Sequence, residues 1–198
     1  VEATKDLVCA YKPNLAFYVA YGNEGVAALN RTIMDIRILA PDVPVILDAK
    51  FADIGNTNAG YAKFAFEYLG ADAVTVNPYL GREALQPFLD RKDKGIFVLC
   101  RTSNPGSGEF QDYQDRGCSP LYQYVAFCVM NRWNENGNCA VVVGATCPRE
   151  LGGVRLIVGD MPILIPGVGA QGGNVDTTVN EGKDSRGRGM IINSSRGI

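Results

Sequence analysis

Three charged side chains near the end of one apolar segment have types and spacing that suit acid–base chemistry. Asp48 and Lys50 come directly after the apolar residues 45–47, and Asp53 follows a few positions later. If this segment is a strand, Asp48 and Lys50 point to the same face, because side chains alternate along a strand. Charges at the end of a buried strand are costly to desolvate unless they form a network. Such networks are typical of functional sites.

Lys50 is the strongest candidate for a proton donor. The sequence contains no histidine, which excludes Ser-His-Asp and Cys-His catalysis and leaves Lys, Asp, Glu, Tyr and Cys for proton transfer. A lysine held between carboxylates stays charged and oriented, and a carboxylate fixed beside an anionic substrate raises the free energy of the bound substrate. A structural ion pair between Asp48 and Lys50 is the alternative, although buried pairs add little net stability.

Further polar residues follow other apolar segments. Lys12 lies just before Pro13, and Ser103 lies in the turn-like sequence Thr-Ser-Asn-Pro-Gly. A solvated lysine and an ordinary turn are the alternative interpretations. The longer segment 103–119 is interpreted equally well as a lid or as a surface connection.

Two segments near the end of the chain suggest a phosphate site. Residues 166–173 include four glycines and Gln171, and Ser195 and Arg196 follow the last apolar run. Glycines let backbone N–H groups approach a ligand closely, and an arginine offers a two-pronged hydrogen-bonding group for phosphate. The glycine segment matches neither the dinucleotide-binding nor the Walker pattern. A tight turn is its alternative interpretation.

Short apolar runs alternate with longer amphipathic stretches along the chain. The predicted strands are 7–11, 43–48, 73–77, 96–101, 139–144, 163–166 and 190–193, and the predicted helices are 25–39, 58–69, 82–90, 120–133, 149–158 and 175–181. This alternation indicates an α/β protein with parallel strands. The candidate site segments all follow strands, and such segments meet on one face in a (β/α)8 TIM barrel. This favours the barrel over an open doubly wound sheet, where fewer of them would converge.

The composition is that of a soluble globular domain. Hydrophobic residues make up 46% and charged residues 20% of 198, and the net charge is −2. Neither nucleic-acid nor membrane binding is expected from this balance. The six cysteines include no C-x-x-C pair, which predicts reduced, buried thiols and a cytoplasmic location.

Several motifs together resemble the orotidine 5′-phosphate decarboxylase family. Residues 48–54 fit its D-x-K-x-x-D-I signature, and residues 9–14, 77–81, 102–106, 143–146 and 166–173 resemble its longer bacterial-type branch, which also occurs in bifunctional UMP synthases. The resemblance implies a homodimer with shared active sites. It places Lys12, Asp48 and Lys50 in one subunit, Asp53 and Thr57 across the interface, Ser103 at the pyrimidine, and Gln171, Ser195 and Arg196 at the phosphate.

The resemblance also implies a reaction without metal or cofactor. Orotidine 5′-phosphate would lose carbon dioxide, and Lys50 would protonate the C6 carbanion. Residues 1–198 would form a single barrel domain that lacks the family's first strand and last helix, and a fusion to an orotate phosphoribosyltransferase is left open. The alternatives are a magnesium-dependent enzyme for sugar phosphates on the same barrel and a catalytically silent barrel that binds UMP.

Overall fold

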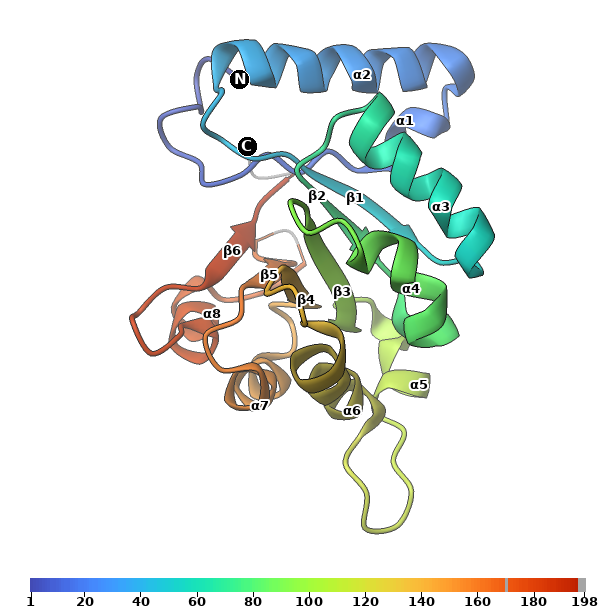
Figure 1. Ribbon diagram of the computed structural model, residues 1–198. Coiled ribbons are helices and arrows are strands. Elements are labelled where there is room, and N and C mark those ends of the chain that lie inside the picture. The colour runs from blue at the N-terminus through green and yellow to red at the C-terminus, as the bar shows by residue number, and fades with distance from the viewer. Residues whose placement is uncertain (170, 196–198) are drawn as a thin grey trace. The chain divides into compact units, whose positions relative to one another are not determined.

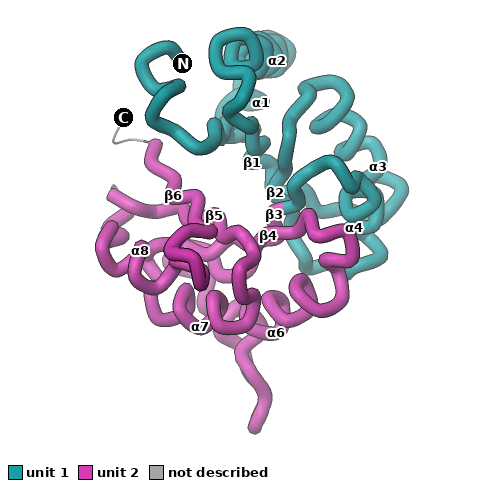
Figure 2. Tube along the Cα trace, turned by 60° about the vertical axis from the view of Figure 1, so that its left-hand side comes forward, with its two compact units in different colours: residues 1–96 teal, residues 97–198 magenta. Residues whose placement is uncertain are grey.

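A computed structural model describes residues 1–169 and 171–195 of the chain (Figure 1). The chain divides into two compact units, Val1–Ile96 and Phe97–Ile198, shown in different colours in Figure 2. None of the helices in the described ranges is long and apolar enough to cross a membrane.

The first unit alternates helices with two strands. Its elements are α1 (Leu15–Val19), α2 (Gly22–Leu39), β1 (Ile46–Phe51), α3 (Gly55–Lys63), the π-helix η1 (Phe64–Tyr68), β2 (Ala73–Val76), the 3-10 helix η2 (Pro78–Leu80) and α4 (Gly81–Leu89). Strands β1 and β2 are parallel, with Ile46 opposite Ala73. Helix α2 buries Leu29, Ile33 and Ile36, whose spacing of three to four residues forms one apolar face.

The predicted strand 7–11 is wrong. Tyr11 and Asn14 make only isolated parallel bridges, to Val45 and Asp48. Tyr11 exchanges backbone hydrogen bonds with Pro44 and Ile46, and the carbonyl of Pro13 accepts the N–H of Asp48. In a parallel ladder with residues 44–48, the next backbone N–H donor after Tyr11 would be that of residue 13, and proline has no N–H. The ladder therefore does not continue beyond Tyr11, which is the one residue of 7–11 that makes a bridge.

The second unit continues the alternation. Its elements are β3 (Gly95–Arg101, whose first two residues belong to the first unit), the 3-10 helix η3 (Pro105–Ser107), α5 (Gly108–Gln111), α6 (Leu121–Cys128), the π-helix η4 (Val129–Trp133), β4 (Cys139–Val143), α7 (Pro148–Val158), β5 (Ile163–Pro166), α8 (Val175–Gly182) and β6 (Met190–Asn193). Strand β5 pairs in parallel with β4 and with β6. All five residues of β4 are buried, as expected for a parallel strand covered on both faces.

The other six predicted strands are confirmed, with ends that differ by three residues or fewer. All six predicted helices are present, although 58–69 begins earlier, at Gly55, and ends as η1, and 120–133 ends as η4. Helices α1 and α5 were not predicted, because five and four residues are too few to show a helical period. The start of α1 had a local signal in Asn14, whose side chain accepts the N–H of Ala16.

The six cysteines are all free thiols. Cys100, Cys128 and Cys139 are buried as predicted, whereas Cys9 and Cys118 are exposed and Cys147 is half-buried. Burial raises the pKa of Cys100 to about 12 and that of Cys139 to about 11. These two thiols therefore stay protonated at neutral pH and act as small apolar core side chains.

Candidate active site

A chain of three charged side chains lies in the first unit. Asp48, on β1, receives Lys12 Nζ on Oδ2 at 2.8 Å and Lys50 Nζ on Oδ1 at 2.6 Å. The side chains of Lys12 and Asp48 are only 11% and 10% exposed, while that of Lys50 is 46% exposed. Asp48 therefore binds both lysines, and the side chain of Lys50 is the more exposed of the two.

The surroundings of Asp48 favour its ionised form. Burial raises its pKa, but the charge of Lys12 and the hydrogen bonds from Lys12 and Lys50 outweigh burial, so that its pKa lies below the ordinary value. Asp48 is consequently a carboxylate at neutral pH. It accepts hydrogen bonds and fixes the two cations on opposite oxygens.

The backbone at Lys50 is irregular. The parallel register of β1 with β2 breaks between Leu47 and Phe51. Lys50 itself has a φ of +53°, a left-handed conformation that L-residues other than asparagine and aspartate rarely adopt. An irregular strand at a charged cluster re-aims side chains, as β-bulges beside active sites do.

Asp53 and Thr57 lie beyond β1, at the start of α3. One carboxylate oxygen of Asp53 accepts the N–H of Ile54 at 2.8 Å, and the Asp53 carbonyl accepts Nδ2 of Asn58 at 2.7 Å. Asn58 also donates to the carbonyl of Ala84, which fixes the helix start. Thr57 is exposed. Within the described residues the ion pairs of Asp48 are with the two lysines, and the Asp53 carboxylate is not bonded to Lys50.

Ser103 and Gln171 meet in the second unit. Ser103 follows β3, and its Oγ donates to Oε1 of Gln171 at 2.8 Å. Gly144 and Gly167 make room for this pair: a Cβ on Gly144 would lie 2.7–2.8 Å from Cβ, Cα and N of Ser103. A Cβ on Gly167 would lie 3.1 Å from the Gln171 side chain. Gly144 is therefore required for the close approach of the Ser103 backbone, and Gly167 leaves room for the Gln171 side chain.

The described residues of the glycine-rich loop, 166–169 and 171–173, bond to one another. Gly167, Gly169 and Gly172 have positive φ angles of 99°, 78° and 90°. The N–H groups of Gly169, Gly172 and Gly173 bond to carbonyls inside the loop. Because these three N–H groups are already bonded within the loop, they are not the groups that would contact a ligand as predicted.

The second part of the predicted phosphate site is only partly described. Ser195 is exposed, and its Oγ accepts Nδ2 of Asn193 at 3.2 Å. Arg196 lies outside the described residues. The pairing of Arg196 with a phosphate group therefore stays a prediction.

The first half of segment 103–119 is fixed to the end of β3. Nε and Nη2 of Arg101 contact the two carboxylate oxygens of Asp112 at 2.8 and 2.9 Å, and Nη1 of Arg101 donates to Ser107. Gln111 accepts the N–H of Thr102 at 2.8 Å. This two-pronged ion pair orders the turn that carries Ser103.

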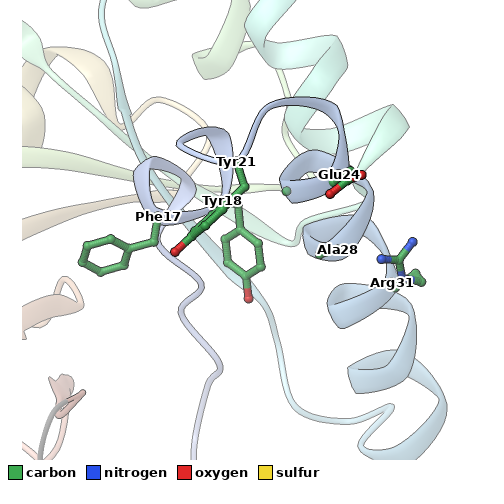
Figure 3. Close-up of a pocket in the computed structure, with 7 residues that line it drawn as sticks. Phe17, Tyr18, Tyr21, Glu24, Ala28 and Arg31 are labelled. Atoms are coloured by element: carbon green, nitrogen blue, oxygen red, sulfur yellow. The ribbon is translucent and has the colours of Figure 1, made fainter.

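A separate cavity of about 460 Å³ lies between α1 and α2 (Figure 3). It is lined by Phe17, Tyr18, Tyr21, Glu24, Gly25, Ala28 and Arg31. Gly25 brings the two helices together, because a Cβ there would lie 1.8 Å from the carbonyl oxygen of Tyr18. None of these seven described lining residues is a predicted site residue.

Thr75 is a site residue that sequence reasoning missed. It lies on β2, is 1% exposed, and bonds to both Asp48 and Lys50. Threonine is common in strands, so Val-Thr-Val is ordinary for a strand. The available signal was a polar residue inside a segment otherwise expected to be buried on both faces.

The comparisons with known proteins agree on one family. The model of the orotidine 5′-phosphate decarboxylase / HUMPS family matches residues 1–198. Proteins named orotidine 5′-phosphate decarboxylase from Janthinobacterium sp. and Cellvibrio japonicus are 52% and 50% identical over the whole chain, which spans 72% and 71% of their lengths.

Solved structures extend the likeness to the fold. The UMP synthase of Leishmania donovani has a TM-score of 0.91 at 46% identity, with 95% of this chain and 41% of that chain covered. The OMP decarboxylase of the same organism has a TM-score of 0.88 at 44% identity, with 95% and 72% covered. The parallel β/α units are thus those of a (β/α)8 barrel with fewer than eight strands among the described residues. The chain belongs to the orotidine 5′-phosphate decarboxylase / HUMPS family.

Proposed function

We propose that Lys50 is the proton donor in the decarboxylation of orotidine 5′-phosphate by this protein. The reaction itself follows from the family: the enzyme converts orotidine 5′-phosphate to UMP in pyrimidine biosynthesis. The observation that supports the role of Lys50 is its position: its ammonium lies 2.6 Å from Asp48, and its side chain is nearly half exposed.

The proposed step balances without a further reactant. The bond between C6 of the pyrimidine and its carboxylate breaks, carbon dioxide leaves, and the electron pair remains on C6. Nζ of Lys50 gives its proton to C6 and is protonated again from solvent. A cation already oriented toward the developing negative charge stabilises the transition state without reorganisation.

Asp48 serves this step in two ways. It orients Lys50, and its carboxylate lies where the departing carboxylate of the substrate would be crowded by like charge. The repulsion is relieved as carbon dioxide leaves, so it favours the transition state over the ground state. Lys12, on the other carboxylate oxygen, keeps Asp48 ionised and in place.

Substrate recognition is proposed for the loops of the second unit. Ser103 would contact the pyrimidine, with Gln171, Ser195 and Arg196 at the phosphate. The hydrogen bond between Ser103 and Gln171 supports a link between the two subsites. Binding energy from the phosphate, remote from the bond that breaks, would serve to close loops around the charged groups.

A homodimer with shared sites is also proposed, with Asp53 and Thr57 acting in the neighbouring subunit's site. The absence of a bond between Asp53 and Lys50 in the described residues fits such a role. A cytoplasmic location and a fusion with a phosphoribosyltransferase remain proposals. The UMP synthase among the similar structures supports the second of these.

Turnover is expected to be unaffected by a chelator. The loss of orotidine 5′-phosphate absorbance is followed in the presence and absence of excess EDTA, and equal rates are expected because Lys50 and Asp48 supply the charges that the step needs. Restoration by added magnesium of activity lost to EDTA would instead support the metal-dependent sugar-phosphate branch of the barrel.

Gly144→Ala is expected to weaken substrate binding. The new Cβ would lie 2.7–2.8 Å from Ser103, including its backbone, so Ser103 must leave the position in which it bonds to Gln171. A displaced hydrogen-bonding group costs about 1–3 kcal/mol, so KM is expected to rise about tenfold, with a smaller change in kcat. Gly153→Ala on α7, where a Cβ meets only a side-chain amide at 3.7 Å, is the matched control. Equal KM values for the two variants would contradict the expectation.

A further inference from the structure

We infer that Thr75 is a positioning residue that sets the geometry of Asp48 and Lys50. Its hydroxyl makes two hydrogen bonds, accepting the backbone N–H of Lys50 at 2.9 Å and donating to Oδ1 of Asp48 at 3.0 Å. The side chain is 1% exposed, so water does not compete for either bond. This inference rests on the proposed role of Lys50.

The strand irregularity explains why a side chain is needed here. Leu47 pairs with Val74 and Phe51 with Val76, so four steps along β1 correspond to two steps along β2. Residues 48–50 therefore fall out of the regular ladder. The N–H of Lys50 bonds to the Thr75 hydroxyl in place of a β2 carbonyl. A buried N–H without a partner would cost free energy, and Thr75 removes that cost.

The same bond stabilises an unfavourable backbone conformation. Lys50 has a φ of +53°, a left-handed conformation that is unfavourable for a residue with a Cβ. Such a conformation persists only where surrounding contacts fix it. The left-handed turn sends the Lys50 side chain back to Asp48, two positions earlier in the chain, at 2.6 Å.

The hydroxyl also fixes the direction of its own proton. Asp48 is ionised and can only accept, so the Thr75 proton points to Asp48 and its lone pairs face the N–H of Lys50. Oδ1 of Asp48 thus receives both the Thr75 hydroxyl and Nζ of Lys50. One buried hydroxyl determines the spacing of the carboxylate and the backbone that carries the proton donor.

Thr75→Val tests this role, because valine keeps the shape and removes both hydrogen bonds. We expect kcat to fall ten- to a hundredfold, since a small displacement of a reacting group costs this much. KM is expected to stay within about threefold, because the phosphate and pyrimidine contacts come from other residues. Thr75→Ser, which keeps the hydroxyl, is expected to recover most of kcat.

Thr178→Val is the matched control. Thr178 is also 1% exposed, and its hydroxyl donates to the carbonyl of Asn174. Thr178→Val therefore measures the effect of losing a buried hydroxyl that does not bond to Asp48 or Lys50. Loss of kcat in Thr75→Val but not in Thr178→Val, with recovery in Thr75→Ser, supports the inference. Equal kcat values for parent and Thr75→Val, or equal losses in Thr75→Ser and Thr75→Val, overturn it.

Two further variants keep the outcome decisive. Thr75→Ala removes the hydroxyl without adding a methyl group and replaces the valine variant if that protein does not fold. Lys50→Ala, measured alongside, separates the two proposals. If Lys50→Ala is active, the role of Lys50 is wrong; if it is inactive while the hydroxyl-free variants turn over at the parental kcat, only the role of Thr75 is wrong.

Discussion

Lys50→Ala is expected to lose nearly all turnover of orotidine 5′-phosphate while it still binds nucleotide. The variant removes both the proton donor and the cation that faces the developing carbanion. General acid catalysis contributes about 10²–10⁴-fold and preorganised charge contributes further, so we expect kcat to fall at least a thousandfold. The ammonium of Lys50 is one of two cations on Asp48, and Lys12 still neutralises this carboxylate in the variant. The fold should therefore persist.

The measurement combines turnover with binding. Loss of substrate absorbance gives kcat, and calorimetric titration with UMP gives the dissociation constant, which is expected to change less than about tenfold because the phosphate contacts remain. Lys63→Ala, an exposed lysine at the end of α3, is the control for removing a lysine. Turnover of Lys50→Ala near the parental rate would refute the assignment of the proton donor.

Asp53→Ala is expected to be almost inactive alone and to recover activity when mixed with Lys50→Ala. If Asp53 acts in the neighbour's site, a mixed dimer has one site with both mutations and one with neither. Random pairing makes half of the dimers mixed, so about a quarter of all sites become intact. The mixture should therefore reach roughly a quarter of the parental rate, although each variant alone is almost inactive.

The control for this experiment is a mixture in which both changes lie on one chain. The double variant Lys50→Ala, Asp53→Ala mixed with Lys50→Ala forms no intact site and should stay inactive. A mixture of the two single variants that shows no gain, after subunit exchange is confirmed by mass, would place Asp53 in its own subunit's site. A fully active monomer would contradict the shared site as well.

The segment Asp48 to Asp53 shows how far local pattern determines this protein. The apolar run before Asp48 predicts a buried strand, and the alternation along a strand predicts that Asp48 and Lys50 share one face. The lack of histidine restricts the proton donor to a lysine or another remaining group. These inferences need only neighbouring residues and composition, which is why the sequence contains them. The same holds for the β/α alternation that identifies the fold class.

Other features depended on contacts between distant residues. Of the residues predicted as strand 7–11, only Tyr11 makes a bridge, and the ladder does not continue because the next donor is Pro13; only the register with β1 shows which residue must donate. The hydrogen bond from Lys12 to Asp48 joins residues that are 36 positions apart in the chain.

The sequence by itself determined the chemistry at the end of β1: a carboxylate beside a lysine, with no histidine to replace either. The tertiary structure alone decided how they are held, through the broken register, the left-handed Lys50 and the hydroxyl of Thr75. The reason is physical. Residue types and their spacing set which groups are available, whereas a hydrogen bond across 25 positions exists only after two strands have paired and one of them has bulged.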